Sequence, residues 1–143
     1  MGYRVHGAVF NDYAEFRHTE NVKPGMCVIE DGKGGLAPST KRLELGANIV
    51  SDTYGFSIGE TSYANTPIAV CGRVLAYPWE HRELFKPGEA VCSGPNGTIS
   101  RMTRDEIRYW PDAIVGYVSE IPDYEEWGSD KVKVNGRIWI KVK

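Results

Sequence analysis

The chain has 143 residues, of which 41% are hydrophobic and 25% charged, and its formal net charge at pH 7 is -2. This length is sufficient for a substantial core, so we expect a single domain over residues 1–143. The small net charge gives no electrostatic reason to expect nucleic acid or an anionic membrane as a partner. No apolar run approaches the length of a membrane-spanning helix, and we expect no signal peptide at the amino end.

Short strand-like segments separated by glycine and proline turns predict a mainly β fold. In chain order, the expected strands cover residues 3–10, 26–29, 48–50, 55–59, 66–77, 90–92 and 113–121. One short helix is expected between Thr103 and Trp110, because Thr103 and Glu106 form a capping box and Pro111 prevents its continuation. Two alternating runs around Asn135-Gly136 predict a C-terminal hairpin over residues 131–143.

Residues 11–17 interrupt the strand pattern, and we expect a single helical or 3₁₀ turn there. Residues three apart on a helical turn share a face, so Asp12 and Glu15 would lie side by side next to Asn11. Two neighbouring carboxylates can divide the acid and base roles of peptide hydrolysis when their environments separate their pKa values. The structural alternative is that Asp12 caps the turn and that Glu15 pairs with Arg17 or His18.

An internal duplication is indicated over residues of approximately 5–60 and 70–121. Most matches share one constant spacing along the chain, and Pro24-Gly25 recurs as Pro87-Gly88 at a slightly shorter spacing. The matched pairs at the constant spacing are Val5 with Val70, Gly7 with Gly72, Val9 with Val74, Glu15 with Glu80, and Arg17 with Arg82. Two similar halves related by a pseudo-two-fold would close into a compact β-barrel or sandwich. In this alignment the second half has no counterpart of Asn11 or Asp12.

Other residue types that commonly form sites show no such pattern. Cys27, Cys71 and Cys92 lack the spacing of metal ligands, and we expect three buried, reduced thiols. The glycines of residues 32–35 fit a hairpin tip better than a phosphate-binding loop. We therefore expect no cofactor and no bound metal ion.

The block Asp12-Tyr13-Ala14-Glu15-Phe16 resembles the start of a known family. This family is the intramolecular-chaperone autoproteolytic cleavage domain (peptidase G2 type), found at the carboxyl end of phage neck-appendage and tail-fibre proteins. Residues 66–70, 86–88, 102–104, 112–116 and 132–139 are similar to proteins of phages and prophages of Gram-positive bacteria. The resemblance implies that the domain is released from the fibre, after a trimer has folded, by a cut just before the aspartate.

Carried over to this chain, the resemblance places the cut at Asn11-Asp12 and implies a glutamic-type peptidase that acts only on its own chain. It gives catalytic roles to Asp12 and Glu15, with Glu15 as the base and Asp12 as its partner or the acid. The family pattern has serine where this chain has Asn11. The side-chain amide of Asn11 offers a second route, in which it attacks its own carbonyl, forms a succinimide and frees the amine of Asp12.

The resemblance also implies partners and a location. The partners are the chain's own upstream fibre segment and two further copies in a homotrimer, within the virion or the host cytoplasm during phage assembly. Two rival functions remain: a non-cleaving structural cap or trimerisation module, and a glycan- or receptor-binding tip. The tip would use aromatic side chains as stacking platforms; the candidates are Trp79, Trp110, Tyr124 and Trp127.

Overall fold

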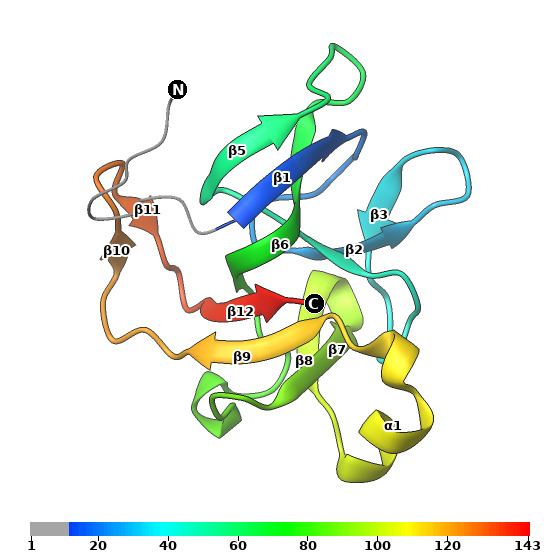
Figure 1. Ribbon diagram of the computed structural model, residues 1–143, viewed down its shortest axis with the longest axis vertical. Coiled ribbons are helices and arrows are strands. Elements are labelled where there is room, and N and C mark those ends of the chain that lie inside the picture. The colour runs from blue at the N-terminus through cyan, green and yellow to red at the C-terminus, as the bar shows by residue number, and fades with distance from the viewer. Residues whose placement is uncertain (1–11) are drawn as a thin grey trace.

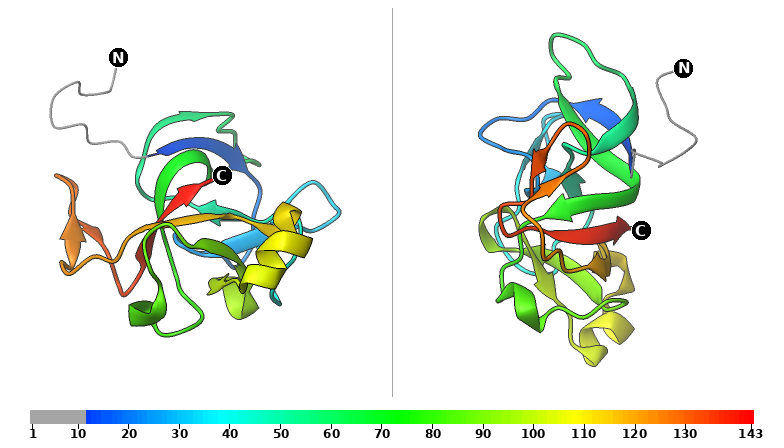
Figure 2. Two further views of the ribbon diagram at one scale, coloured as in Figure 1. Left: turned by 60° about the horizontal axis from the view of Figure 1, so that its bottom comes forward. Right: turned by 90° about the vertical axis from the view of Figure 1, so that its left-hand side faces the viewer.

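The computed structural model describes residues 12–143, which form one large curled β-sheet, a small two-stranded sheet and one short α-helix (Figure 1). Further views show the large sheet bending into a half-barrel (Figure 2). The expected mainly β class with one short helix is thereby confirmed, while the expected strand at residues 3–10 lies outside the described residues. The strands are β1 (Asp12–Arg17), β2 (Cys27–Glu30), β3 (Leu36–Pro38), β4 (Asn48–Val50), β5 (Tyr54–Ile58), β6 (Thr66–Ala76), β7 (Ala90–Gly94), β8 (Thr98–Arg101), β9 (Gly116–Glu120), β10 (Glu126–Trp127), β11 (Val132–Lys133) and β12 (Ile138–Val142). The helical elements are η1 (Arg82–Leu84), η2 (Pro95–Gly97), α1 (Arg104–Tyr109) and η3 (Pro111–Ala113).

The long strand β6 is the centre of the large sheet. The strand order is β3-β2-β4-β6-β12-β9-β7-β8, and β1 and β5 branch from β6. The first part of β6 pairs with β4 and β1, and its second part pairs with β12. The two pairings meet at Gly72, whose φ of +89° is readily adopted only by glycine. β1 lies between β6 and β5, antiparallel to the former and parallel to the latter.

Apolar side chains from both halves of the chain fill the interior of the curl. The main cluster consists of Cys27, Ile49, Ala69, Val74, Ala76, Phe85, Val91, Ile99, Val115, Val118, Ile138, Ile140 and Val142. All three cysteines are free thiols, and Cys27 and Cys92 are buried as expected. Cys71 is exposed, so the expectation of three buried thiols is wrong for this residue. Its strand partner is the half-buried Tyr13 on the outer side of β1.

The two halves of the chain repeat the same hydrogen bonds. Hairpin β2–β3 pairs Val28 with Pro38, and hairpin β7–β8 pairs Val91 with Arg101. Each residue of the second pair follows its counterpart in the first by the same number of positions that separates the two Pro-Gly turns. In the turn before each hairpin, an N–H donates across 3.1 Å to the carbonyl three residues earlier, from residue 26 to 23 and from residue 89 to 86. These repeated bonds support the internal duplication, which stays a prediction.

For residues that precede the hairpins, fewer sequence positions separate corresponding residues of the two halves. The N–H of Leu36 donates to the carbonyl of His18 (2.9 Å), and the N–H of Ile99 donates to that of residue 77 (2.8 Å). These two bonds relate His18 to residue 77 and thereby Glu15 to residue 74, whereas the sequence alignment relates Glu15 to Glu80. The match of Glu15 with Glu80 therefore stays a prediction.

Glu80 has a role of its own in the second half. Its carboxylate accepts hydrogen bonds from the Ser100 hydroxyl (2.6 Å) and from the N–H of Arg101 (3.0 Å), both in β8. A carboxylate that accepts from a strand in this way holds the neighbouring segment in register with it. Glu80 thus has a structural explanation that does not extend to Glu15.

The expected C-terminal hairpin is wrong, although its turn is present. Asn135 and Gly136 have φ of 53° and 78°, and the N–H of Arg137 donates to the carbonyl of Val134 (2.9 Å), as in a tight hairpin turn. The flanking strands then diverge: β11 pairs with β10, whereas β12 pairs with β6 and β9. Burial explains the divergence, because Ile138 and Ile140 are fully buried only within the large sheet.

Gly25→Ala is expected to destabilise the fold more than Gly88→Ala, its counterpart in the second half. The two glycines have φ of 94° and 90°, so alanine costs about 1–2 kcal/mol of backbone strain at either position. At Gly25 a Cβ would also collide with Cδ of Arg137 and lie 2.9 Å from Cε2 of Tyr77, whereas at Gly88 it meets nothing within 4 Å. Urea unfolding of both variants measures the difference, and equal losses of stability would contradict the expectation.

Candidate functional site

Asp12 is a carboxylate buried at the start of β1, with only 4% of its surface exposed. Its two oxygens accept hydrogen bonds from two hydroxyls: Ser51 Oγ donates to Oδ2 (2.6 Å) and Thr53 Oγ1 donates to Oδ1 (2.7 Å). Both hydroxyls come from the loop between β4 and β5, which β1 meets because Asp12 pairs with Tyr54. A buried carboxyl needs such partners, since an unsatisfied polar group costs free energy.

Burial raises the pKa of Asp12 from 3.8 to about 6. The hydrogen bonds from Ser51 and Thr53 act in the opposite direction and lower this pKa, while the negative charge of Asp52 raises it further. The carboxyl therefore changes its protonation state near pH 6, within the range used by proton donors of active sites.

Asp52, the residue between the two hydroxyls, forms an ion pair with Arg137. Arg137 is 2% exposed, and its guanidinium donates to both oxygens of Asp52, each at 3.0 Å. It also donates to the carbonyls of Val134 (3.1 Å) and Lys133. The charge of Arg137 is thus balanced by Asp52, and none of these hydrogen bonds goes to Asp12.

Glu15 does not lie beside Asp12, and the expected helical turn is wrong. In β1 the buried side chains are Asp12, Ala14 and Phe16, while Glu15 is exposed. Residues three apart in a strand lie on opposite faces, so the two carboxylates point in opposite directions. The physical reason is that β1 pairs with β5 and β6 along its length, and these backbone hydrogen bonds override the local preference for a turn.

The structural alternative for the acid pair is wrong for Asp12, while the negative charge of Glu15 does help to raise the pKa of Arg17, after the larger effect of Glu30. Asp12 lies within a strand and caps no helical turn. The guanidinium of Arg17 donates to Glu30 (2.9 and 2.7 Å), and Nδ1 of His18 lies 3.2 Å from the carbonyl oxygen of Tyr63. The third predicted site residue, Asn11, lies outside the described residues.

Sequence reasoning missed the hydroxyls that hold Asp12 and the ion pair between Asp52 and Arg137. Ser51, Asp52 and Thr53 form a polar stretch between two expected strands, which is typical of an ordinary turn. Only the pairing of β1 with β5 brings this loop to Asp12, from which it is far removed in sequence.

Exposed apolar side chains of β5 lie beside Glu15 on the outer face. Glu15 is in register with Ile58 of β5, and Tyr13 is in register with Phe56. Phe56 and Ile58 are 43% and 54% exposed, which is high for large apolar residues on neighbouring positions of one strand face. Within residues 12–143, β5 pairs only with β1 and so forms an edge of the sheet. This face is typical of a surface that contacts another chain.

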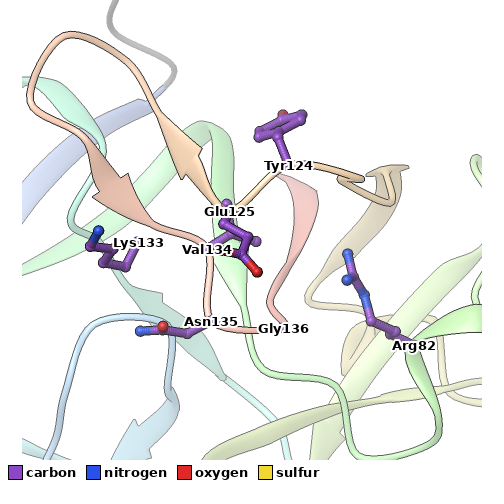
Figure 3. Close-up of a pocket in the computed structure, with 7 residues that line it drawn as sticks. All are labelled: Arg82, Tyr124, Glu125, Lys133, Val134, Asn135 and Gly136. Carbon is purple, nitrogen blue, oxygen red and sulfur yellow. The ribbon is translucent and has the colours of Figure 1, made fainter.

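A separate polar pocket lies between η1, the loop before β10 and the turn before β12 (Figure 3). It has a volume of about 270 Å³, and Figure 3 shows Arg82 on the opposite side of it from Lys133 and Asn135. Its lining residues are Arg82, Tyr124, Glu125, Lys133, Val134, Asn135 and Gly136.

The four aromatic residues considered as glycan platforms do not form one surface. Tyr124 lines the pocket, but its hydroxyl donates a hydrogen bond to Glu120 and accepts one from the indole of Trp139. Trp127 packs edge-to-face on Trp139, with ring centroids 5.2 Å apart. Trp79 and Trp110 are exposed, and lie in the segments after β6 and after α1.

Two further kinds of site have no counterpart in the described part of the chain. Among residues 12–143, no three His, Cys, Asp or Glu side chains are grouped as metal ligands would be. In the same range, no helix has the length and apolar character needed to cross a membrane.

A solved structure shares this fold. The chain is similar to the crystal structure of the bacteriophage phi29 gene product 12 C-terminal fragment, with a TM-score of 0.62 and 15% sequence identity. The similarity covers 92% of this chain and 100% of that chain. No protein-family model matches the chain, and no curated protein matches it either.

Asp12→Asn is expected to remove a pH dependence of the folding stability. The pKa of Asp12 is about 6 in the fold and 3.8 in a model peptide, so the folded state binds the proton more tightly. This stabilisation is complete below pH 3.8 and is lost as the pH rises through 6, by up to about 3 kcal/mol. The neutral asparagine lacks this dependence.

Urea unfolding of wild type and Asp12→Asn between pH 4 and 8 measures the effect. Glu15→Gln is the matched control, since it removes an exposed carboxylate from the same strand. The difference in unfolding free energy between wild type and Asp12→Asn should change across this range. Parallel stability curves for these two chains would show that the buried carboxyl does not titrate as expected.

Proposed function

We propose that the chain is the carboxyl-terminal domain of a phage fibre or appendage protein, which promotes trimer assembly and then separates itself by cutting Asn11-Asp12. The fold shared with the phi29 gene product 12 C-terminal fragment and the Asp12–Phe16 block support this assignment. The main support for cleavage is the buried Asp12 carboxyl, whose pKa is raised to about 6. This carboxyl lies on the same residue as the amide nitrogen that the cut would release.

Cleavage of the link needs a nucleophile and a proton for the leaving amine. In the hydrolytic route a water molecule adds to the Asn11 carbonyl, and the Asp12 carboxyl protonates the amine as the C–N bond breaks. In the succinimide route the bond forms between Nδ2 of Asn11 and its own carbonyl carbon. The Asp12 carboxyl again protonates the departing amine, and the proton displaced from Nδ2 returns to the carboxylate.

Glu15 would contribute to this reaction from a neighbouring copy. Within one chain it lies on the face of β1 opposite to Asp12, next to the exposed Phe56 and Ile58. In a trimer this apolar face offers a surface for the next copy. Glu15 on that surface would act as the base at the Asn11-Asp12 link of the neighbour.

A longer chain carrying the upstream fibre is expected to split at Asn11-Asp12, giving two bands on a denaturing gel. Asp12→Asn should slow the split by at least about a hundredfold, because it removes the general acid. Glu20→Gln is a suitable control, since it removes an exposed carboxylate just beyond β1. The mass of the upstream piece separates the routes, because the succinimide is lighter than the hydrolysed end by one water.

The two main candidate functions differ in the result of this experiment. A non-cleaving cap or trimerisation module gives a single full-length band for wild type and for every variant, while the trimer still forms. The separation of Asp12 and Glu15 onto opposite faces is the observation that favours this second candidate.

A mixing experiment tests the role of Glu15. Chains carrying Glu15→Gln are expected to split slowly alone and to regain cleavage when co-expressed in mixed trimers with Asp12→Asn chains. In such trimers the Asp12→Asn copy supplies Glu15 to a neighbour whose own Asp12 is intact. A distinct tag on each chain identifies which copy is cut. Cutting of the Glu15→Gln copy at an unchanged low rate would show that Glu15 does not act between copies.

A further inference from the structure

We propose that Ser51 and Thr53 position the Asp12 carboxyl so that it delivers its proton to the leaving nitrogen of the Asn11-Asp12 link. This inference rests on the proposed self-cleavage and adds two residues to it, neither of which belongs to the Asp12–Phe16 block. It assigns the partners of Asp12 within one chain to the loop between β4 and β5, in place of Glu15.

The geometry at Asp12 is that of a fixed carboxyl. One hydroxyl donates to each oxygen, at 2.6 Å from Ser51 and 2.7 Å from Thr53, so the plane of the carboxyl is held at both ends. Asp12 and the two hydroxyl residues are all buried. A carboxyl held in this way loses little freedom when it reacts, which is the benefit of a positioning residue.

The loop that carries the hydroxyls is itself anchored to the sheet. The N–H of Ser51 donates to the carbonyl of Pro67 in β6 (2.9 Å), and the N–H of Thr53 donates to Ser51 Oγ (3.1 Å). Just before the loop, Val50 and Met26 are joined by a 3.0 Å backbone hydrogen bond. These bonds fix the hydroxyl oxygens relative to β6, the strand with which Asp12 pairs.

Hydroxyls suit a carboxyl that must both lose and regain a proton. A hydroxyl can donate to the ionised carboxylate and accept from the protonated acid by rotating its O–H bond. An arginine or a backbone N–H can only donate, and so holds a carboxylate in its ionised form. Ser51 and Thr53 therefore support Asp12 in the state before proton transfer and in the state after it.

The residue between the two hydroxyls, Asp52, pairs with the buried cation Arg137. Asp52 receives both hydrogen bonds from the buried Arg137 guanidinium, while its neighbours Ser51 and Thr53 face Asp12. Were Arg137 paired with Asp12 instead, its charge would favour the ionised carboxylate and remove the acid. Along the loop, Asp52 thus balances the charge of Arg137, while the hydroxyls on either side of it hold the carboxyl that would donate the proton.

The test uses Thr53→Val, which keeps the shape of the side chain and removes the hydroxyl, together with Ser51→Ala and the conservative Thr53→Ser. Thr19→Val is the matched control, because Thr19 is 9% exposed and its hydroxyl bonds to that of Thr66 at 2.7 Å. Two quantities are measured: the pH profile of cleavage in the longer chain, and the carboxyl ¹³C titration of Asp12 by NMR.

Thr53→Val and Ser51→Ala are expected to raise the pKa of Asp12, because each hydroxyl favours its ionised form. The pH profile of cleavage should move upward with the titration, and the maximal rate should fall about tenfold. Thr53→Ser should restore both quantities, and Thr19→Val should change neither.

The possible outcomes separate this inference from the proposed function. If the pKa of Asp12 shifts while the pH profile and rate of cleavage stay constant, Asp12 is not the proton donor. The inference is then wrong, although the self-cleavage itself still stands. If the titration does not respond to either variant, the hydroxyls do not hold the carboxyl. If wild type shows no cleavage in an assembled trimer, the self-cleavage itself is wrong and this inference fails with it.

Discussion

One buried cation holds together segments that are far apart in the sequence. The guanidinium of Arg137 makes a bidentate ion pair with Asp52 from the first half of the chain. It also donates to the carbonyl of Val134 in the turn before β12. It also lies 5.7 Å from the ring centre of Tyr77, and its Cδ occupies the space beside Gly25. A buried charge without partners costs several kcal/mol, so these segments are constrained to stay around it.

This constraint extends to the candidate site through three consecutive residues. Asp52 faces the guanidinium, and the hydroxyls on either side of it face Asp12. Fixing the loop on the cation therefore also fixes the environment of the buried carboxyl. The raised pKa of Asp12 depends on its burial, because an open loop would admit water to the carboxyl and lower this pKa.

Local signals in the sequence predicted the elements that depend on local interactions. The helix begins where Thr103 and Glu106 predict it, and both hydrogen bonds of the capping box are present. The Pro-Gly turns before β2 and β7 also lie where expected. The conformation of β1 was not predictable in this way, because an inward-facing carboxylate contradicts the usual strand pattern and is tolerated only through Ser51 and Thr53. The pairing of the last strand, β12, likewise depends on partners distant in sequence, since an Asn-Gly turn indicates a hairpin but does not determine which strands pair.

A cut made just before Asp12 would change the charge beside its buried carboxyl. It would create a positively charged α-ammonium on the same residue. That new charge would draw the carboxyl into its ionised form and form an internal ion pair, which would oppose rejoining of the two pieces. The buried acid would then make the separation effectively one-way.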